Sequence, residues 1–327
     1  MRAFRREVTR ACVALFAASW LLVSAKQAAA ERRRDLRDYV VKAVEKMMRD
    51  HPKQGYEHGT YFTHDLQYGS ETVPASQHHP HTMCVAAVTE VIITALSMYA
   101  DETKDTSIFK TIPARSWAKK SRNDLRPYLF MLPDVHSVGT ADALEEFGIG
   151  EQVAFRDLLK GDFINFNREK TGHAVVFWGF INKNGDIEPT YDEKRVVGFE
   201  YFSAQNSTQG LAFKWAYFAP YCHKDPKKPA DCGVTWSTRQ RTLNSGYLLH
   251  PSEWHVAEAN AERLHQALGA RIAHHLGPSA KPSDLKKLSS KKIEELKILA
   301  QRDLEIESSE DDPPASYDED GEEAGGT

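Results

Sequence analysis

Apolar residues recur at helical spacing through the first half of the chain. Within residues 32–50 this spacing predicts one amphipathic helix. The next stretch, residues 53–81, is rich in Gly, Tyr, His, Ser and Pro and predicts a long irregular loop. A continuous apolar run then predicts a buried helix over residues 84–99, and weaker helical patterns follow over residues 116–130 and 141–147.

The hydrophobic period changes to that of strands in the middle of the chain. Four segments are rich in β-branched and aromatic residues, namely DFINFN, HAVVFWGFI, RVVGFEYFSAQ and LAFKWAYF, at residues 162–167, 173–181, 195–205 and 211–218. The connections between them are too short to hold crossover helices, which favours an antiparallel sheet. Helices followed by a strand meander predict an α+β fold with the helices packed on one side of the sheet.

Two helical patterns and an acidic tail end the chain. One pattern stops before the Gly277-Pro278 break, and the second predicts an exposed helix before residue 308. The patterns divide the chain into a leader, an N-terminal helix with its linker, a main domain, C-terminal helices and a tail predicted to be disordered. These parts cover residues 1–30, 31–60, 61–250, 251–305 and 306–327. The C-terminal helices and tail are either a binding arm for a protein partner or a solvated extension.

The leader and the net charge limit where the protein works and what it binds. The 327 residues carry a formal charge of -4, so no basic excess indicates nucleic acid as a partner. The leader begins with basic residues, continues with the apolar ACVALFAASWLLVSA, and ends in a small-residue cleavage pattern around Ala28 and Ala30. We expect a cleaved signal peptide and a periplasmic or secreted protein. An uncleaved anchor is the alternative, although the run of about fifteen apolar residues is shorter than the roughly 20 that a spanning helix needs. No later stretch predicts a membrane span.

Three cysteines remain once the leader, with Cys12, is removed. Export would place them in a compartment that permits disulfides. Cys222 and Cys232 bracket a short loop rich in Pro and Lys, so we expect a disulfide between them, two reduced thiols being the alternative. Cys84 then stays a free thiol.

Cys84 falls in the first turn of the predicted buried helix, with Thr82 as the expected cap. The free N–H groups and the dipole at a helix N-terminus lower a thiol pKa, which favours a nucleophile. Cysteine is also a good small core residue, so simple burial is the competing interpretation.

A nucleophilic thiol needs a base and a group that orients the base. His173 begins the strand HAVVFWGFI after a turn at Gly172, which would expose the imidazole at the strand's start. A structural histidine is the alternative. Gln205 or Asn206, at the end of a neighbouring strand, could accept the imidazole N–H and fix its tautomer.

This ordered set resembles the papain-like-fold cysteine peptidases and amidases of the CHAP and NlpC types. The likeness rests on a cysteine at a buried helix start, then GDFINF, then GHAVVFWGF, then a strand that ends in an amide, over about residues 61–218. It implies a papain-like core in which Cys84 attacks an amide, His173 acts as base and acid, and Asn206, with Gln205 as substitute, orients His173. CHAP-type enzymes usually carry a glutamine beside the cysteine, where this chain has Met83.

The resemblance further implies an acyl-transfer mechanism. The Cys84 N–H would form part of an oxyanion hole, with Gln77 or His81 as a second donor. Peptide or amide bonds, above all in peptidoglycan, are the implied substrates, and no cofactor is implied.

Two rival functions remain open. One is a papain-like module that has lost activity and binds wall fragments or a protein. The other is a zinc site, for which the chain offers competent ligand types close together in sequence, His78, His79, His81 and Cys84.

Overall fold

The structure is a computed structural model of the chain. It describes residues 35–51, 56, 62–75, 81–118, 124–132, 135–167, 172–205, 210–222, 230–232, 243–276, 289 and 291–299. The expected signal peptide and acidic tail lie outside these residues.

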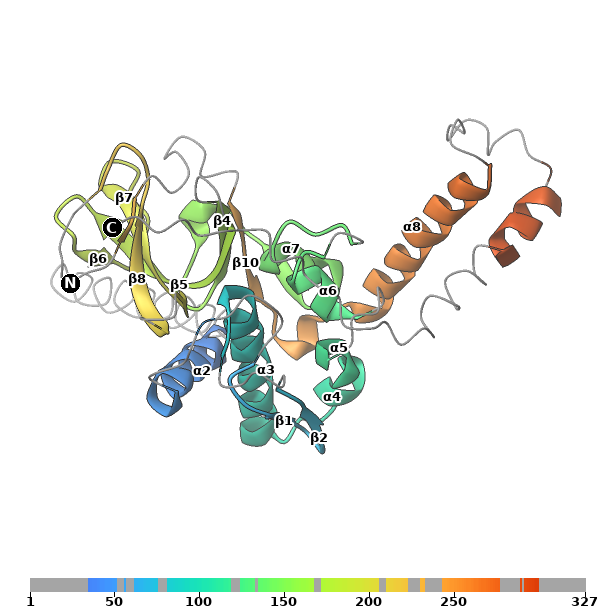
Figure 1. Cartoon of the computed structure of the whole chain (residues 1–327), viewed down its shortest axis with the longest axis horizontal. Coiled ribbons are helices and arrows are strands. Elements are labelled where there is room, and N and C mark those ends of the chain that lie inside the picture. Colours follow the sequence, from blue (N-terminus) through green and yellow to red (C-terminus); the bar gives the residue numbers. More distant parts are fainter. Residues whose placement is uncertain are drawn as a thin grey trace, which may run out of the picture.

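One large sheet carries the fold, and helices pack against it (Figure 1). Its strand order is β3-β10-β4-β5-β7-β8-β9, and β6 pairs with β5 beside this path. All the pairs are antiparallel except β8 with β9, which is parallel. The strands are β3 (Gly150–Gln152), β4 (Phe163–Asn167), β5 (Gly172–Asn182), β6 (Ile187–Glu188), β7 (Val196–Ala204), β8 (Leu211–Tyr217), β9 (Ala230–Asp231) and β10 (Asn244–Leu248).

Alternating side chains give the sheet two apolar faces, since successive residues of a strand point to opposite sides. Ala174 and Val176 of β5 belong to a core that also contains the buried side of α2 (Arg37–Asp50) and most of α3 (Cys84–Thr103). We call this the α3-side core. Val175 and Phe177 belong to a second, aromatic cluster on the opposite face, the far-side core. It comprises Phe155, Leu158, Ile164, Phe166, Val175, Phe177, Phe180, Val196, Phe199, Tyr201, Ala216, Phe218 and Leu243.

Helices α2 and α3 lie side by side against the sheet (Figure 1). α3 has buried residues on every side, since it is covered by the sheet, α2 and the hairpin of β1 (Leu66–Tyr68) and β2 (Glu71–Val73). Among the residues that the structure describes, α3 is the helix long and apolar enough to cross a membrane, but 78% of its apolar window is buried inside the fold. That is the pattern of a core helix.

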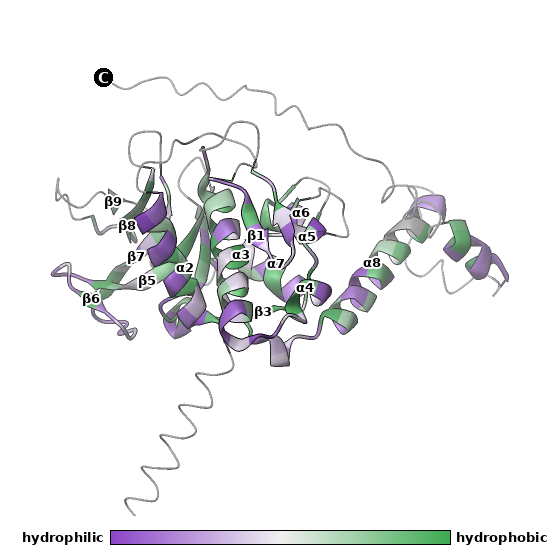
Figure 2. Cartoon of the chain, turned by 90° about the horizontal axis from the view of Figure 1, so that it is seen from below, coloured by the Kyte–Doolittle hydropathy of each residue, from purple (hydrophilic) through white to green (hydrophobic). Residues whose placement is uncertain are grey.

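The helices after α3 are α4 (Ile108–Thr111), α5 (Arg115–Ala118), α6 (Leu125–Leu129), α7 (Thr140–Glu146) and α8 (Val256–Leu276). Among the shorter helices, α7 packs on β3, β10 and β4, whereas α4 and α5 pack against the hairpin of β1 and β2; the long helix α8 leaves the sheet. Figures 1 and 2 show α8 extending away from the body. Arg263 anchors the first half of α8 to the body of the protein. The Arg263 guanidinium lies 3.6 Å from the Phe147 ring centroid and donates a hydrogen bond to the Glu146 carbonyl.

A buried ion pair ties α2 to the sheet at the Gly161-Asp162 turn. Asp162 is fully buried and accepts hydrogen bonds from Arg37 Nε, from Arg37 Nη2 at 3.3 Å and from the Leu159 N–H at 2.8 Å. Gly161 has φ +100°, and a Cβ there would lie 2.8 Å from the Arg37 carbonyl oxygen, so only glycine fits. Gly161 and Asp162 of the GDFINF motif therefore anchor α2 to the sheet. The buried side of α2 belongs to the core of the main domain.

The α+β class and the antiparallel sheet predicted from the sequence are confirmed. The expectation of an irregular loop over residues 53–81 is wrong for the hairpin of β1 and β2. Leu66 and Tyr68 alternate with polar residues, and Tyr68 packs edge-on against Phe109 and Trp117. This alternation buries one face of the hairpin. The packing of that face stabilises the hairpin although its strands are very short.

Candidate active site and metal cluster

Cys84 is the first residue of α3. Its side chain is 6% exposed, and Cys84 is the cysteine outside any disulfide in the part of the chain that the structure describes. The N-cap position belongs to Met83, in an extended conformation and without a side-chain cap, so the expectation that Thr82 caps the helix is wrong. The Thr82 hydroxyl instead donates to the Met83 carbonyl at 3.5 Å. The thiol therefore lies at the positive end of a 20-residue helix.

His173 is the second residue of β5 and is buried, at 4% exposure, so the expectation that a turn at Gly172 exposes the imidazole is wrong. Its ring packs edge-on against Phe166 and Tyr201, with ring centroids 5.5 Å apart in each case. Both neighbours belong to the far-side core. The imidazole thus lies on the sheet face opposite the one against which Cys84 packs.

Cys84 and His173 nevertheless belong to the same end of the sheet. Tyr99, near the C-terminal end of α3, packs against His250, which follows β10. The other end of β10 pairs with Asn165 of β4, and Asn165 pairs with the start of β5. The N-terminal end of α3 therefore points toward the edge where β5 begins. The structure brings the thiol and the imidazole to this edge, on opposite faces, and their catalytic pairing stays a prediction.

Gln205 directly follows β7 and lies on the same face as His173, because the alternation of β7 places it on the side of Tyr201. The Tyr201 hydroxyl lies 3.4 Å from Gln205 Oε1, and the Gln205 amide donates to the Ser203 and Ala212 carbonyls at 3.3 Å. Gln205 therefore lies beside Tyr201, whose ring packs against the His173 imidazole. Of the other predicted site residues, Asn206 and Gln77 lie outside the described residues.

The network around Tyr201 continues to the disulfide. The Tyr201 hydroxyl donates its one proton to Asp231, which also accepts a hydrogen bond from Lys214 Nζ at 2.7 Å. Asp231 precedes Cys232, and the predicted disulfide between Cys222 and Cys232 is present, with Cα atoms 5.3 Å apart. The disulfide therefore helps to hold β9 beside β8, where the Asp231 side chain contacts Tyr201 of the far-side core.

Two of the four residues of the predicted zinc site, His81 and Cys84, lie within the described part of the chain. His81 is half-buried, and Cys84 follows it closely. His78 and His79 lie outside the described residues, so this ligand set stays a prediction.

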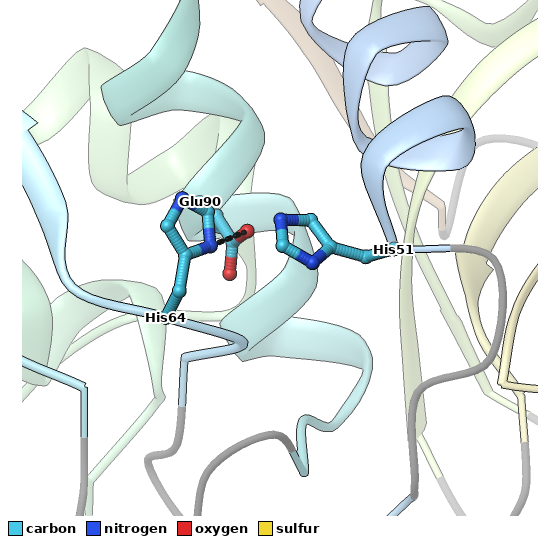
Figure 3. Close-up of side chains that lie close together, drawn as sticks. All are labelled: His51, His64 and Glu90. Atoms are coloured by element: carbon cyan, nitrogen blue, oxygen red, sulfur yellow. Dashed lines mark ion pairs between the residues drawn. The ribbon is translucent and has the colours of Figure 1, made fainter.

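A second cluster of ligand-type side chains, which was not predicted from the sequence, lies beside the N-terminal half of α3 (Figure 3). It consists of His51 at the end of α2, His64 just before β1, and Glu90 of α3. Each offers one ligand-type atom, and these atoms all lie within 4.8 Å of one another. No short motif joins the three positions, but Glu90 is a charged residue inside an apolar helix, and that was the available signal.

Burial dominates the electrostatics of this cluster. It raises the pKa of the fully buried Glu90 to about 7, although hydrogen bonds from Thr63 oppose the rise. Burial lowers the pKa of both His51 and His64, since it disfavours the charged imidazolium. Near neutral pH both imidazoles are therefore mainly in the neutral form that binds metal ions.

Comparison with known proteins adds no assignment. No family model, curated protein or solved structure matches this chain.

Proposed function

We propose that the chain is an exported cysteine amidohydrolase with a papain-like core, which cleaves peptide or amide bonds of peptidoglycan. One observation carries the proposal. Cys84 is the first residue of the long helix α3, and that end of the helix points toward the sheet edge where His173 and Gln205 lie. A helix start stabilises a thiolate, which is the nucleophilic form of cysteine.

In this proposal the Cys84 thiolate attacks the amide carbonyl, and the C–N bond breaks to leave a thioester on Sγ. His173 gives a proton to the departing amine. It then takes a proton from water, whose oxygen attacks the thioester; the C–S bond breaks, the acyl group leaves as a carboxylic acid, and the thiolate is restored. The Cys84 N–H stabilises the oxyanion of both tetrahedral intermediates, with Gln77 or His81 as second donor. Gln205, or Asn206, orients the imidazole.

The face on which His173 lies is the observation that favours the alternative. If the thiol and the imidazole do not act together, the chain is a papain-like module that binds wall fragments and does not cleave them. Because His173 is only the second residue of β5, its ring lies close to the strand's start, and the proposed pairing forms around that edge.

Hydrolysis by the purified chain tests the proposal. The wild-type chain should release new amino groups from peptidoglycan, and Cys84→Ser should lower that rate by at least about a hundredfold, because a neutral hydroxyl replaces the thiolate. Met98→Leu, a change on the same helix far from its start, is the matched control and should keep the wild-type rate. Equal release by Cys84→Ser, or none by the folded wild-type chain, would contradict the proposal.

A further inference from the structure

Three side chains from three separate segments converge on one point beside α3 (Figure 3). The rings of His51 and His64 are stacked, with centroids 4.5 Å apart and planes inclined by 28°. His64 Nδ1 lies 3.6 Å from a carboxylate oxygen of Glu90. In Figure 3 both rings turn toward this carboxylate, one from each side.

The carboxylate of Glu90 is fixed by its neighbour Thr63. The Thr63 N–H donates to one carboxylate oxygen at 3.0 Å, and the Thr63 hydroxyl lies 2.5 Å from the other. The same hydroxyl lies 2.8 Å from His64 Nδ1. Such outer hydrogen bonds hold ligating side chains in one orientation and are typical of metal sites.

The surroundings of Glu90 supply little positive charge. Its side chain is fully buried, and within the described residues the lysine that acts on its charge is Lys46, which is 42% exposed and forms an ion pair with Asp50. A buried carboxylate is costly unless a cation or several hydrogen bonds compensate it. The arrangement of one carboxylate and two imidazoles is one that a divalent cation would complete.

We infer that His51, His64 and Glu90 bind a divalent transition-metal ion of the Zn²⁺ type, which fastens the end of α2 and the segment before β1 to α3. Two nitrogen ligands and one carboxylate are a recognised zinc ligand set. Two imidazoles argue against Ca²⁺ and Mg²⁺, which prefer oxygen. With metal–ligand bonds of about 2.0–2.2 Å, the ligand atoms stand roughly 3–3.5 Å apart, so small side-chain rotations close the present cluster.

This site is distinct from the thiol of Cys84 and does not depend on the proposed hydrolysis. Glu90 follows Cys84 by six residues on α3, a rise of about 9 Å along the helix. The inference also differs from a zinc site at His81 and Cys84, because none of its three ligands is shared.

Metal binding to the purified full chain tests the inference, with Zn²⁺ and Co²⁺ alone as probes. Zinc per folded chain after dialysis, Zn²⁺ affinity and the visible spectrum of bound Co²⁺ are measured for the wild type, His51→Gln, His64→Gln and Glu90→Gln. Two matched controls accompany them. His255→Gln removes an exposed histidine elsewhere, and Cys84→Ser removes the thiol of the rival set.

The wild type and both controls should bind one Zn²⁺, give a Co²⁺ spectrum free of thiolate bands, and melt at a higher temperature with Zn²⁺. His51→Gln and His64→Gln should weaken binding at least about tenfold and lose the thermal shift. These two histidines are only partly buried, so their variants keep the test valid if Glu90→Gln does not fold. Absence of Zn²⁺ binding by the wild type, unchanged binding in His51→Gln and His64→Gln, or loss of binding in Cys84→Ser would overturn the inference.

Discussion

Replacing Arg37 with Met should destabilise the protein strongly, and more at high pH than at low pH. The Asp162 side chain has no solvent exposure and that of Arg37 has 14%. Arg37 also binds Asp35 at 2.6 Å, and its guanidinium lies 3.9 Å from the Tyr247 ring centroid. Methionine keeps much of this packing and removes the charge, so it isolates the ion pair.

The expected loss at pH 8 is about 3–5 kcal/mol of unfolding free energy, the usual cost of leaving one partner of a buried pair uncompensated. Burial already raises the pKa of Asp162 to about 6, and the Arg37 guanidinium opposes that rise. Without Arg37 the pKa of Asp162 in the folded state should rise further, while its unfolded value stays near 3.8. The folded state then binds more protons than the unfolded state between the two values, so stability falls as pH rises through that window. The loss should therefore be smaller at pH 5, by about 1.4 kcal/mol for each unit by which the pKa rises.

Urea unfolding followed by tryptophan fluorescence at pH 5 and pH 8 measures both effects. Arg49→Met is the matched control. It lies on the same helix, its side chain is 68% exposed, and its loss should stay below about 1 kcal/mol. Combining Arg37→Met with Asp162→Asn should recover part of the stability and remove the pH dependence. A loss below about 1 kcal/mol at pH 8 in Arg37→Met, or an equal loss at both pH values, would refute the reasoning.

Three further changes test other parts of the fold. Replacing Cys222 and Cys232 with Ala should lower the unfolding free energy by about 3 kcal/mol, as measured in urea without reductant, because the bridge closes a short loop; a loss below about 1 kcal/mol would contradict this. Ile92→Ala should cost about 2–5 kcal/mol by the same assay, since Ile92 is fully buried on α3; a cost under about 1 kcal/mol would mean that α3 does not pack as described. Gly198→Ala should lower the melting temperature sharply, because its Cβ would lie 2.1 Å from the Ala216 carbonyl oxygen across β7 and β8; an unchanged melting temperature would exclude that register.

The elements with strong periodicity were predictable from sequence, and the weak ones were not. The ends of the long strands β5 and β7 were predicted to within a residue or two, because β-branched and aromatic residues dominate both strands. β10 has the sequence NSGYL, which carries little strand preference. It forms because β3 and β4, far away in sequence, offer edges on both sides of it. Pairing over such separations leaves no local pattern to recognise.

The candidate site shows the same division. The helix start at Cys84 and the strand position of His173 follow from local pattern, and the structure has both. The face of the sheet on which His173 lies depends on the register of β4, β5 and β7, which no local pattern sets. The cluster of His51, His64 and Glu90 depends on how α2 and the hairpin pack on α3, so it appears only in three dimensions.

The rate at which iodoacetamide alkylates Cys84, measured against pH in the wild type and in His173→Ala, tests the central claim most directly. A free thiol has a pKa of about 8.5 and reacts slowly below it. We expect fast alkylation that persists well below that pH and slows or shifts in His173→Ala, as a thiolate–imidazole pair requires. Slow alkylation that begins only near pH 8.5 and does not respond to His173→Ala would exclude such a pair and leave the binding module as the function.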